Sequence, residues 1–235
     1  MINNFTSHKG TYPNAEKHTQ WPGNGADPED PVLFQFAASQ VEYLADNETT
    51  QRLILDIARP LLEKTGPAIL VVHSQAGRYG WLISDSCYES VRGLVALEPS
   101  GPPFTNGKNA KFSENYGLTD FPLHFDPPVS HPSELEREWR DAPEPGKRSF
   151  WTLKEHTRTL PRFRNIPVLI VTAEASYHHE YDYLTHEFLT RAGVAHDFIS
   201  LETLGIHGNG HMMMMEKNNL EIASVLAGWL KKKIG

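Results

Sequence analysis

The chain is predicted to fold as one α/β domain around a parallel sheet. Four short apolar segments rich in Val, Ile and Leu have the length of buried strands, at 67–73, 91–98, 166–173 and 196–202. Segments with helical spacing of apolar residues alternate with them. Such alternation is typical of parallel sheets covered by helices. A length of 235 residues is enough for one domain, here 1–235, with a sizeable core.

The predicted helices begin before the first strand. Apolar residues recur at roughly helical spacing from Val32 to Leu44, and a second helix should run from an N-cap at Asn47 to about Lys64, stopped by Gly66. One face of that second helix should be buried through Leu53, Ile54, Ile57, Ala58, Leu61 and Leu62. Three further helices are expected at 78–89, 181–192 and 218–231, the last with Leu220 turned inward.

Composition and charge exclude several classes of partner. A net charge of -7, with Lys and Arg scattered along the chain, argues against nucleic acid and acidic membrane surfaces. No apolar run reaches the length of about 20 residues that spans a bilayer, and the first residues are polar. We therefore expect a soluble, cytoplasmic protein. The single cysteine, Cys87, excludes an intramolecular disulfide.

Residues 67–77, Pro-Ala-Ile-Leu-Val-Val-His-Ser-Gln-Ala-Gly, predict a nucleophile elbow. The buried strand breaks abruptly into small residues, and a sharp turn there would expose the hydroxyl of Ser74 above the sheet. Ala76 and Gly77 suit the close approach of strand and helix, whereas Val72 stands where the common G-x-S-x-G motif has glycine. The alternative is an ordinary serine between a strand and a loop.

A serine nucleophile needs a base, and the base needs an orienting acid. Glu98 ends the strand that follows the elbow, and Glu174 ends the next one, so two acids compete. The histidine should lie in the glycine-rich loop 205–211 after the last strand, where His211 is the expected base and His207 the alternative. Each of these histidines could equally be an ordinary surface loop residue.

Residues 101–160 interrupt the alternation of strands and helices. They contain 8 of the 17 prolines and several aromatic residues, which indicates an ordered insertion rather than a flexible linker. We expect it to form a cap over the site, with an insertion remote from the chemistry as the alternative. The expected substrate pocket is lined by His73, Tyr116, Phe121, Phe125, Trp151 and Met212.

The spacing of the histidines does not match a metal-binding motif. His178, His179 and His186 form the densest cluster, but His186-Glu187 lacks the second histidine that a zinc-binding helix requires. No metal and no cofactor are expected.

These motifs together resemble a group of microbial α/β-hydrolase-fold esterases in which the elbow has the sequence Val-His-Ser-Gln. The resemblance runs from about residue 17 to the C-terminus and also covers 19–23, 95–99, 173–178 and 208–212. It implies an α/β-hydrolase-like sheet flanked by helices, and that Val72 is normal in the elbow. It further implies that Glu98 is the triad acid and His211 the base.

The resemblance fails at the start of the chain. Members of the group carry further strands there, and a His-Gly loop that supplies one oxyanion N–H; residues 1–31 show neither. We therefore expect an N-terminally shortened chain that lacks the first strands and keeps one oxyanion donor, the backbone N–H of Gln75. The strand 67–73 would then be an edge, which predicts self-association.

The sequence thus favours a serine esterase that cleaves small carboxylic esters through an acyl-enzyme intermediate. The alternative is a catalytically impaired or non-catalytic hydrolase-like module that only binds a ligand, because the oxyanion loop is missing.

Overall fold

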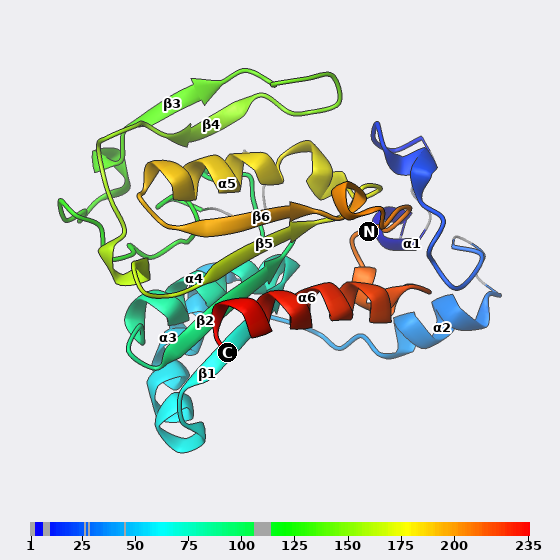
Figure 1. Ribbon diagram of the computed structural model, residues 1–235, viewed down its shortest axis with the longest axis horizontal. Helices are drawn as coiled ribbons and strands as arrows, with labels where there is room; N and C mark the ends of the chain where they lie inside the picture. Colours follow the sequence, from blue (N-terminus) through cyan, green and yellow to red (C-terminus); the bar gives the residue numbers. More distant parts are fainter. Residues whose placement is uncertain (1–2, 7–9, 26, 28, 45, 106–113) are drawn as a thin grey trace.

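Four parallel strands form the centre of the protein. The computed structural model describes residues 3–6, 10–25, 27, 29–44, 46–105 and 114–235. Its main sheet has the order β1-β2-β5-β6 (Figure 1). The strands are β1 (Ala68–His73), β2 (Val91–Leu97), β5 (Val168–Thr172) and β6 (His196–Ser200), each lying within the predicted segment. The predicted α/β fold is confirmed.

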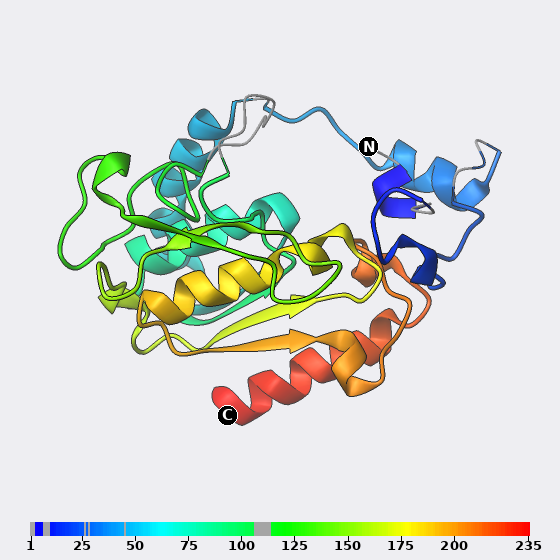
Figure 2. The ribbon, with the colours of Figure 1, turned by 90° about the horizontal axis from the view of Figure 1, so that it is seen from above.

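Helices cover both faces of this sheet (Figures 1 and 2). The α-helices are α1 (Asn3–Thr6), α2 (Pro31–Ala38), α3 (Asn47–Thr65), α4 (Gly77–Ser86), α5 (Asp182–Arg191) and α6 (Asn219–Lys233). Short 3₁₀ helices occupy Ala15–Lys17, Ser74–Ala76, Pro132–Glu134, Pro161–Phe163, Tyr177–Glu180, Leu201–Leu204 and Met213–Met215.

The two faces of the strands enter two separate cores. Leu94 and Ile170 pack in the core formed with α3, α4 and α5, which contains Trp81 and Phe188. Their chain neighbours Val95 and Val171 pack instead with Ile222 and Trp229 of α6. Because successive side chains of a strand point to opposite faces, a continuous apolar strand is buried on both sides.

The helix before α3 is shorter than predicted. It ends at Ala38, and the apolar residues after it are left exposed, Val41 by 85% and Leu44 by 53%. Burial of an apolar face stabilises most helices, so spacing alone does not extend this one. The cap of α3 also differs by one residue: Asp46, not Asn47, accepts from the N–H of Thr49 at 2.7 Å.

The apolar face predicted for α3 is only partly buried. Ala58 and Leu62 enter the core, but Leu53, Ile57 and Leu61 are each about half exposed. Leu220 of α6, predicted to point inward, is 78% exposed. Helical spacing identified these faces without showing how much of each has a neighbour.

β1 lies at an edge of the sheet, as predicted. Within the described residues it pairs only with β2. Val71 lies opposite Val95, on the face that α6 covers elsewhere, and is 58% exposed. The expected self-association through this edge stays a prediction.

The insertion 101–160 contains a ribbon that was not predicted. Strands β3 (Arg137–Arg140) and β4 (Phe150–Leu153) pair antiparallel and pack on α5, on the side away from the main sheet (Figure 1). In the turn that joins them, Lys147 Nζ donates to the carbonyl of His179 at 2.8 Å. Residues 106–113 of the insertion lie outside the described residues. The role of the insertion as a cap stays a prediction.

Candidate active site

The turn after β1 holds Ser74 in an unusual backbone conformation. Its φ is +55°, in the left-handed region that costs a residue other than glycine about 1–3 kcal/mol. The N–H of Ser100 donates to the carbonyl of Ser74 at 2.8 Å and supports the turn. A Cβ on Gly77 would lie 2.5 Å from Cβ of Pro99, so only glycine lets α4 start this close. The predicted elbow is therefore present as a strand, a tight turn and a helix.

Gly80 explains why the elbow tolerates Val72. A Cβ on Gly80 would lie 2.9 Å from Cγ2 of Val72, closer than real Cβ atoms approach. The space that a small strand residue provides in the common motif comes here from a glycine one turn into α4. Val72 can therefore fill the contact between strand and helix.

Ser74, His211 and Glu98 form one chain of hydrogen bonds. His211 Nε2 lies 2.8 Å from Ser74 Oγ, and His211 Nδ1 lies 2.5 Å from Glu98 Oε2. Glu98 and His211 are buried, with exposures of 0% and 1%. Ser74 follows β1, Glu98 follows β2 and His211 lies in the loop after β6, so all three stand at the carboxyl edge of the sheet. This order of hydroxyl, imidazole and carboxylate allows the imidazole to accept the serine proton.

Glu98 is held by three donors. Oε1 accepts from the N–H of Ala173 at 2.8 Å, and Oε2 accepts from Ser176 Oγ at 2.7 Å besides contacting His211. Burial raises the pKa of Glu98 to about 8, whereas His178 and the donors of Ser176 and Ala173 act to lower it. These three donors fix the position of the carboxyl group, and when it is ionised its two oxygens can accept from all three at once.

Aromatic rings surround the imidazole of His211. His178 stacks on it with 4.5 Å between ring centroids and 7° between planes, and Phe5 lies 5.5 Å away at 23°. The tilted ring of Tyr177 is 4.9 Å away. Burial raises the pKa of Tyr177, so its hydroxyl stays protonated. The sequence indicated the place of two of these rings, because Tyr177 and His178 lie a few residues after the predicted strand 166–173, at the same edge of the sheet.

His73 contacts the backbone of the histidine loop. Its Nε2 lies 2.8 Å from the carbonyl of His211, which can only accept, so this nitrogen carries the hydrogen. Burial lowers the pKa of His73 to about 4 and keeps the ring neutral. The predicted pocket residue therefore helps to hold the base.

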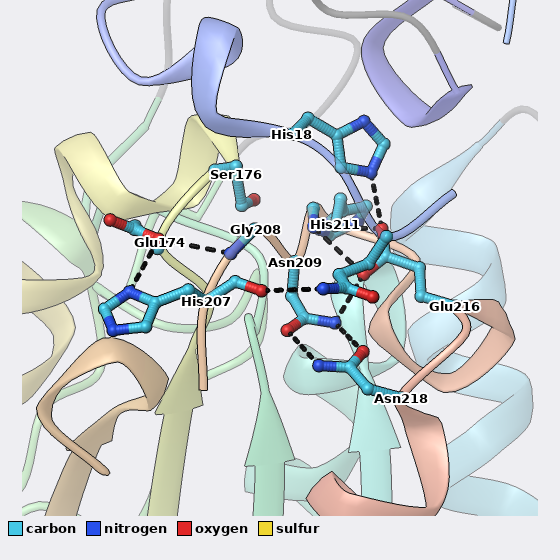
Figure 3. A network of polar contacts seen from close by, with 12 residues as sticks. His18, Glu174, Ser176, His207, Gly208, Asn209, His211, Glu216 and Asn218 are labelled. Carbon is cyan, nitrogen blue, oxygen red and sulfur yellow. Dashed lines mark hydrogen bonds and ion pairs between the residues drawn. The ribbon is translucent and has the colours of Figure 1, made fainter. Parts of the chain in front are cut away.

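A buried carboxylate fixes the loop that carries His211 (Figure 3). Glu216 accepts from the N–H of Gly210 at 2.9 and 3.1 Å and from Asn209 Nδ2 at 2.7 Å. Its Oε1 lies 2.6 Å from Nε2 of His18. Sequence reasoning missed His18 and Glu216, because they are far apart in the chain and belong to no recognised motif.

The segment that begins at Thr19 packs directly on this loop. The N–H groups of Thr19 and Gln20 donate to the carbonyl of Gly208 at 3.0 and 3.2 Å. Gly208 has φ +77°, and a Cβ there would lie 2.1 Å from Thr19 Oγ1. The start of the resembling region thus packs on and supports the loop that carries His211.

A profile of the alpha/beta hydrolase family matches residues 18–225. The chain belongs to the alpha/beta hydrolase family. It is 40% identical over 234 residues to a protein of Fungal sp. (strain ATCC 74256) called "Probable secreted lipase phiG", a match that covers 97% of this chain and 63% of that one. The chain thus spans less than two thirds of that relative's length.

A solved structure shows the same fold at lower identity. It is described as "The Atomic Resolution Structure of a Novel Bacterial Esterase" and superposes with a TM-score of 0.55. The match is 21% identical and covers 87% of this chain and 51% of the bacterial one. Within the described part of the chain, no helix combines the length and apolar character needed to cross a bilayer.

Glu174 and His207, the alternative acid and base, contact each other and not Ser74. His207 Nδ1 lies 3.1 Å from Glu174 Oε2, which also accepts from the N–H of Gly208 at 3.1 Å. Lys17 Nζ lies 3.1 Å from the other oxygen of Glu174. The side chain of His207 is 62% exposed. The structure therefore brings Glu98 and His211 to Ser74, and it pairs the largely buried Glu174 with the exposed His207 elsewhere.

The aromatic residues predicted to line the pocket are dispersed. Phe125 is a core residue with 2% exposure, and it borders a cavity together with Leu123, Val129 and Arg162. Trp151 lies on β4 and packs on Trp139 with 5.3 Å between centroids. That these two residues line a substrate pocket stays a prediction. Tyr116 and Phe121 pack half-buried on the same core as Phe125.

Met212, another predicted pocket residue, lies next to the candidate site. It follows His211 and packs on a small apolar cluster built from the N-terminal segment, which contains Phe5, Trp21, Leu33 and Phe36. This cluster gives the imidazole an apolar neighbour.

The densest histidine cluster of the sequence is separated in space. His179 Nε2 contacts Glu202 Oε1 at 2.8 Å, and His186 Nδ1 contacts His196 Nε2 at 2.8 Å. Among the described residues, the grouping with metal-like spacing is Glu98, His178 and His211, whose ligand atoms lie within 4.8 Å. Both nitrogens of His211 are engaged by Ser74 and Glu98. The prediction of no metal stays a prediction.

Proposed function

We propose that the protein is a serine hydrolase that cleaves small carboxylic esters through an acyl-enzyme intermediate. The observation that supports this most is the continuous chain from Ser74 Oγ through the His211 imidazole to Glu98. The relative called a lipase and the solved bacterial esterase agree with this class of chemistry.

In the proposed reaction Ser74 Oγ attacks the ester carbonyl carbon while His211 Nε2 takes the serine proton. Glu98 stabilises the imidazolium that results. The tetrahedral intermediate collapses, the alcohol leaves with the proton from His211, and the acyl group remains on Ser74. Water, deprotonated by His211, then attacks the acyl-enzyme, which releases the acid and restores Ser74.

The backbone N–H of Gln75 is the proposed oxyanion donor. It follows the nucleophile directly, in the 3₁₀ turn that leads into α4. Each such donor is worth about 10²- to 10³-fold in rate, so a site with one donor would turn over slowly.

The apolar cluster beside His211 favours substrates with an apolar acyl or alcohol group. Phe5 and Met212 place ring and thioether surface next to the base. Thioethers adapt to irregular apolar groups, which suits an acyl chain better than a charged one.

A fluorophosphonate probe and p-nitrophenyl esters test this proposal together. We expect stoichiometric labelling of Ser74 and ester turnover, both lost in Ser74→Ala. Ser84→Ala is the matched control, since the buried hydroxyl of Ser84 has no hydrogen-bond partner in the described part of the chain. A cooperatively folded protein that is unlabelled and turns over at background rate would overturn the enzyme and favour a module that only binds a ligand.

The expected cytoplasmic location also stays a prediction. The fungal relative's name describes that protein as secreted.

A further inference from the structure

A second imidazole lies face to face with the one proposed to act as base. The rings of His178 and His211 are 4.5 Å apart and within 7° of parallel. His178 Nδ1 is in turn 3.0 Å from Asp182 Oδ1. His178 is 2% exposed and Asp182 is fully buried. Two pairs of imidazole and carboxyl group therefore stack in one buried site.

We propose that His178, held by Asp182, is a positioning residue that keeps the His211 ring in the plane joining Ser74 to Glu98. This inference rests on the proposed function. His178 contacts the base by its ring face alone, so it would act through His211 and not on the substrate.

The stacked ring of His178 matters most during deacylation, the second half of the reaction. In the free enzyme His211 has a bond at each nitrogen, to Ser74 and to Glu98. Once Ser74 carries the acyl group, the bond from Nε2 to Ser74 Oγ is lost, while the contact of Nδ1 with Glu98 remains. A parallel ring then limits the tilt of the imidazole while it activates water, since a displacement of about 1 Å can cost about 10²-fold in rate.

The pair of His178 and Asp182 is suited to stand beside a base that becomes positive. Burial lowers the pKa of His178 to about 4 and raises the pKa of Asp182, and both shifts favour the uncharged form of each group. Glu98 is the ionisable group of the other pair that acts on His178, and its negative charge raises the pKa of His178. A protonated ring in the same place would oppose the charge on His211, because like charges this close repel strongly where water is excluded.

One short turn sets the spacing of the two pairs. Ser176 Oγ donates to Glu98 and accepts from the N–H of His178 at 3.1 Å. The acid and the stacked ring are thus tied to the same hydroxyl. Movement of this turn would displace both supports of His211 together.

The test compares His178→Ala, which removes the ring, with His178→Phe, which keeps a flat ring. His186→Ala is the matched control, because His186 also stacks on an aromatic ring, Phe198, at 5.2 Å and 15°, but in another part of the fold. We expect kcat of His178→Ala for p-nitrophenyl esters to fall about 10- to 100-fold. His178→Phe should stay within about threefold of wild type, as His186→Ala should.

The loss in His178→Ala should fall on deacylation. One equivalent of p-nitrophenol per active site should then appear as a burst before slow turnover, which a merely unfolded fraction would not produce. Unchanged kcat in His178→Ala, or an equal loss in His178→Phe, would overturn the inference while leaving the enzyme intact.

A second measurement does not depend on turnover. The downfield NMR signal of the proton between His211 and Glu98 should persist in wild type and His178→Phe and be lost to exchange in His178→Ala. Its persistence in His178→Ala would overturn the positioning role. A wild type that shows this signal but neither turnover nor labelling would instead overturn only the proposed function.

Discussion

Glu98→Gln should remove most of the activity while the protein still folds. The two carboxylate oxygens receive three donors, and two of these, from Ser176 and His211, meet at Oε2. The least costly placement of the glutamine keeps its oxygen there and turns its amide toward the N–H of Ala173. The N–H of Ala173 and the glutamine NH2 that faces it are then both without an acceptor, and each unpaired buried donor costs about 1–3 kcal/mol of stability.

The catalytic loss in this variant should come in addition to the loss of stability. A neutral amide cannot stabilise the imidazolium of His211, and removing the charge of a triad acid lowers kcat by about 10⁴-fold, equivalent to about 5 kcal/mol. Steady-state hydrolysis of p-nitrophenyl esters measures kcat, and thermal unfolding measures the structural cost. Glu174→Gln is the control and should stay within about threefold, because Glu174 contacts Lys17, His207 and Gly208 instead. A large loss in Glu174→Gln with an active Glu98→Gln would refute this assignment of the acid.

Three further perturbations test other parts of the structure. Native His178 stays neutral to about pH 4, while in the unfolded chain it protonates near 6.5. Between these two pH values the unfolded state binds one more proton than the native state, so the free energy of unfolding falls as pH falls. His178→Phe should remove up to about 3 kcal/mol of that decrease, measured by urea titration at several pH values. An unchanged dependence of the unfolding free energy on pH would contradict a buried neutral ring. Glu216→Gln should speed hydrogen exchange at the Gly210 amide, because the N–H of Gly210 donates a hydrogen bond to the Glu216 carboxylate. Equal protection of this amide in the variant would show that Glu216 does not hold the loop. Val71→Lys should lower any self-association seen by sedimentation, and wild-type protein that is monomeric at all concentrations would refute pairing through β1.

The positions of the candidate site residues could be predicted because each depends on a local pattern. Ser74, Glu98 and Glu174 follow apolar segments that predict strands, and His211 ends a loop rich in glycine. The carboxyl ends of parallel strands meet at one edge of a sheet, so these side chains had to lie near each other. The choice between the two acids needed the direction of each carboxylate, which the backbone sets through φ +42° at Glu98.

The supports of the site could not be predicted because they join distant segments. His18 and Glu216 meet across most of the chain, and Phe5 reaches His211 from the first helix. No spacing rule relates such pairs. The partial exposure of α3 and the burial of Phe125 could not be predicted for the same reason. Spacing and composition show whether a segment is apolar, but not which other segments pack against it.

The contact between Val72 and Gly80 shows why the elbow is better defined in space than in sequence. What the turn requires is room where the strand and the following helix approach, and one small residue on either side supplies it. The common motif places that residue in the strand, two positions before the nucleophile, whereas here it lies in α4, six positions after it. A search for the glycine of the strand alone would reject this chain, while a search for small volume at either position would accept it. The departure from the common motif therefore exchanges volume between two facing residues, Val72 and Gly80, and Ser74 stands in the turn with φ +55°.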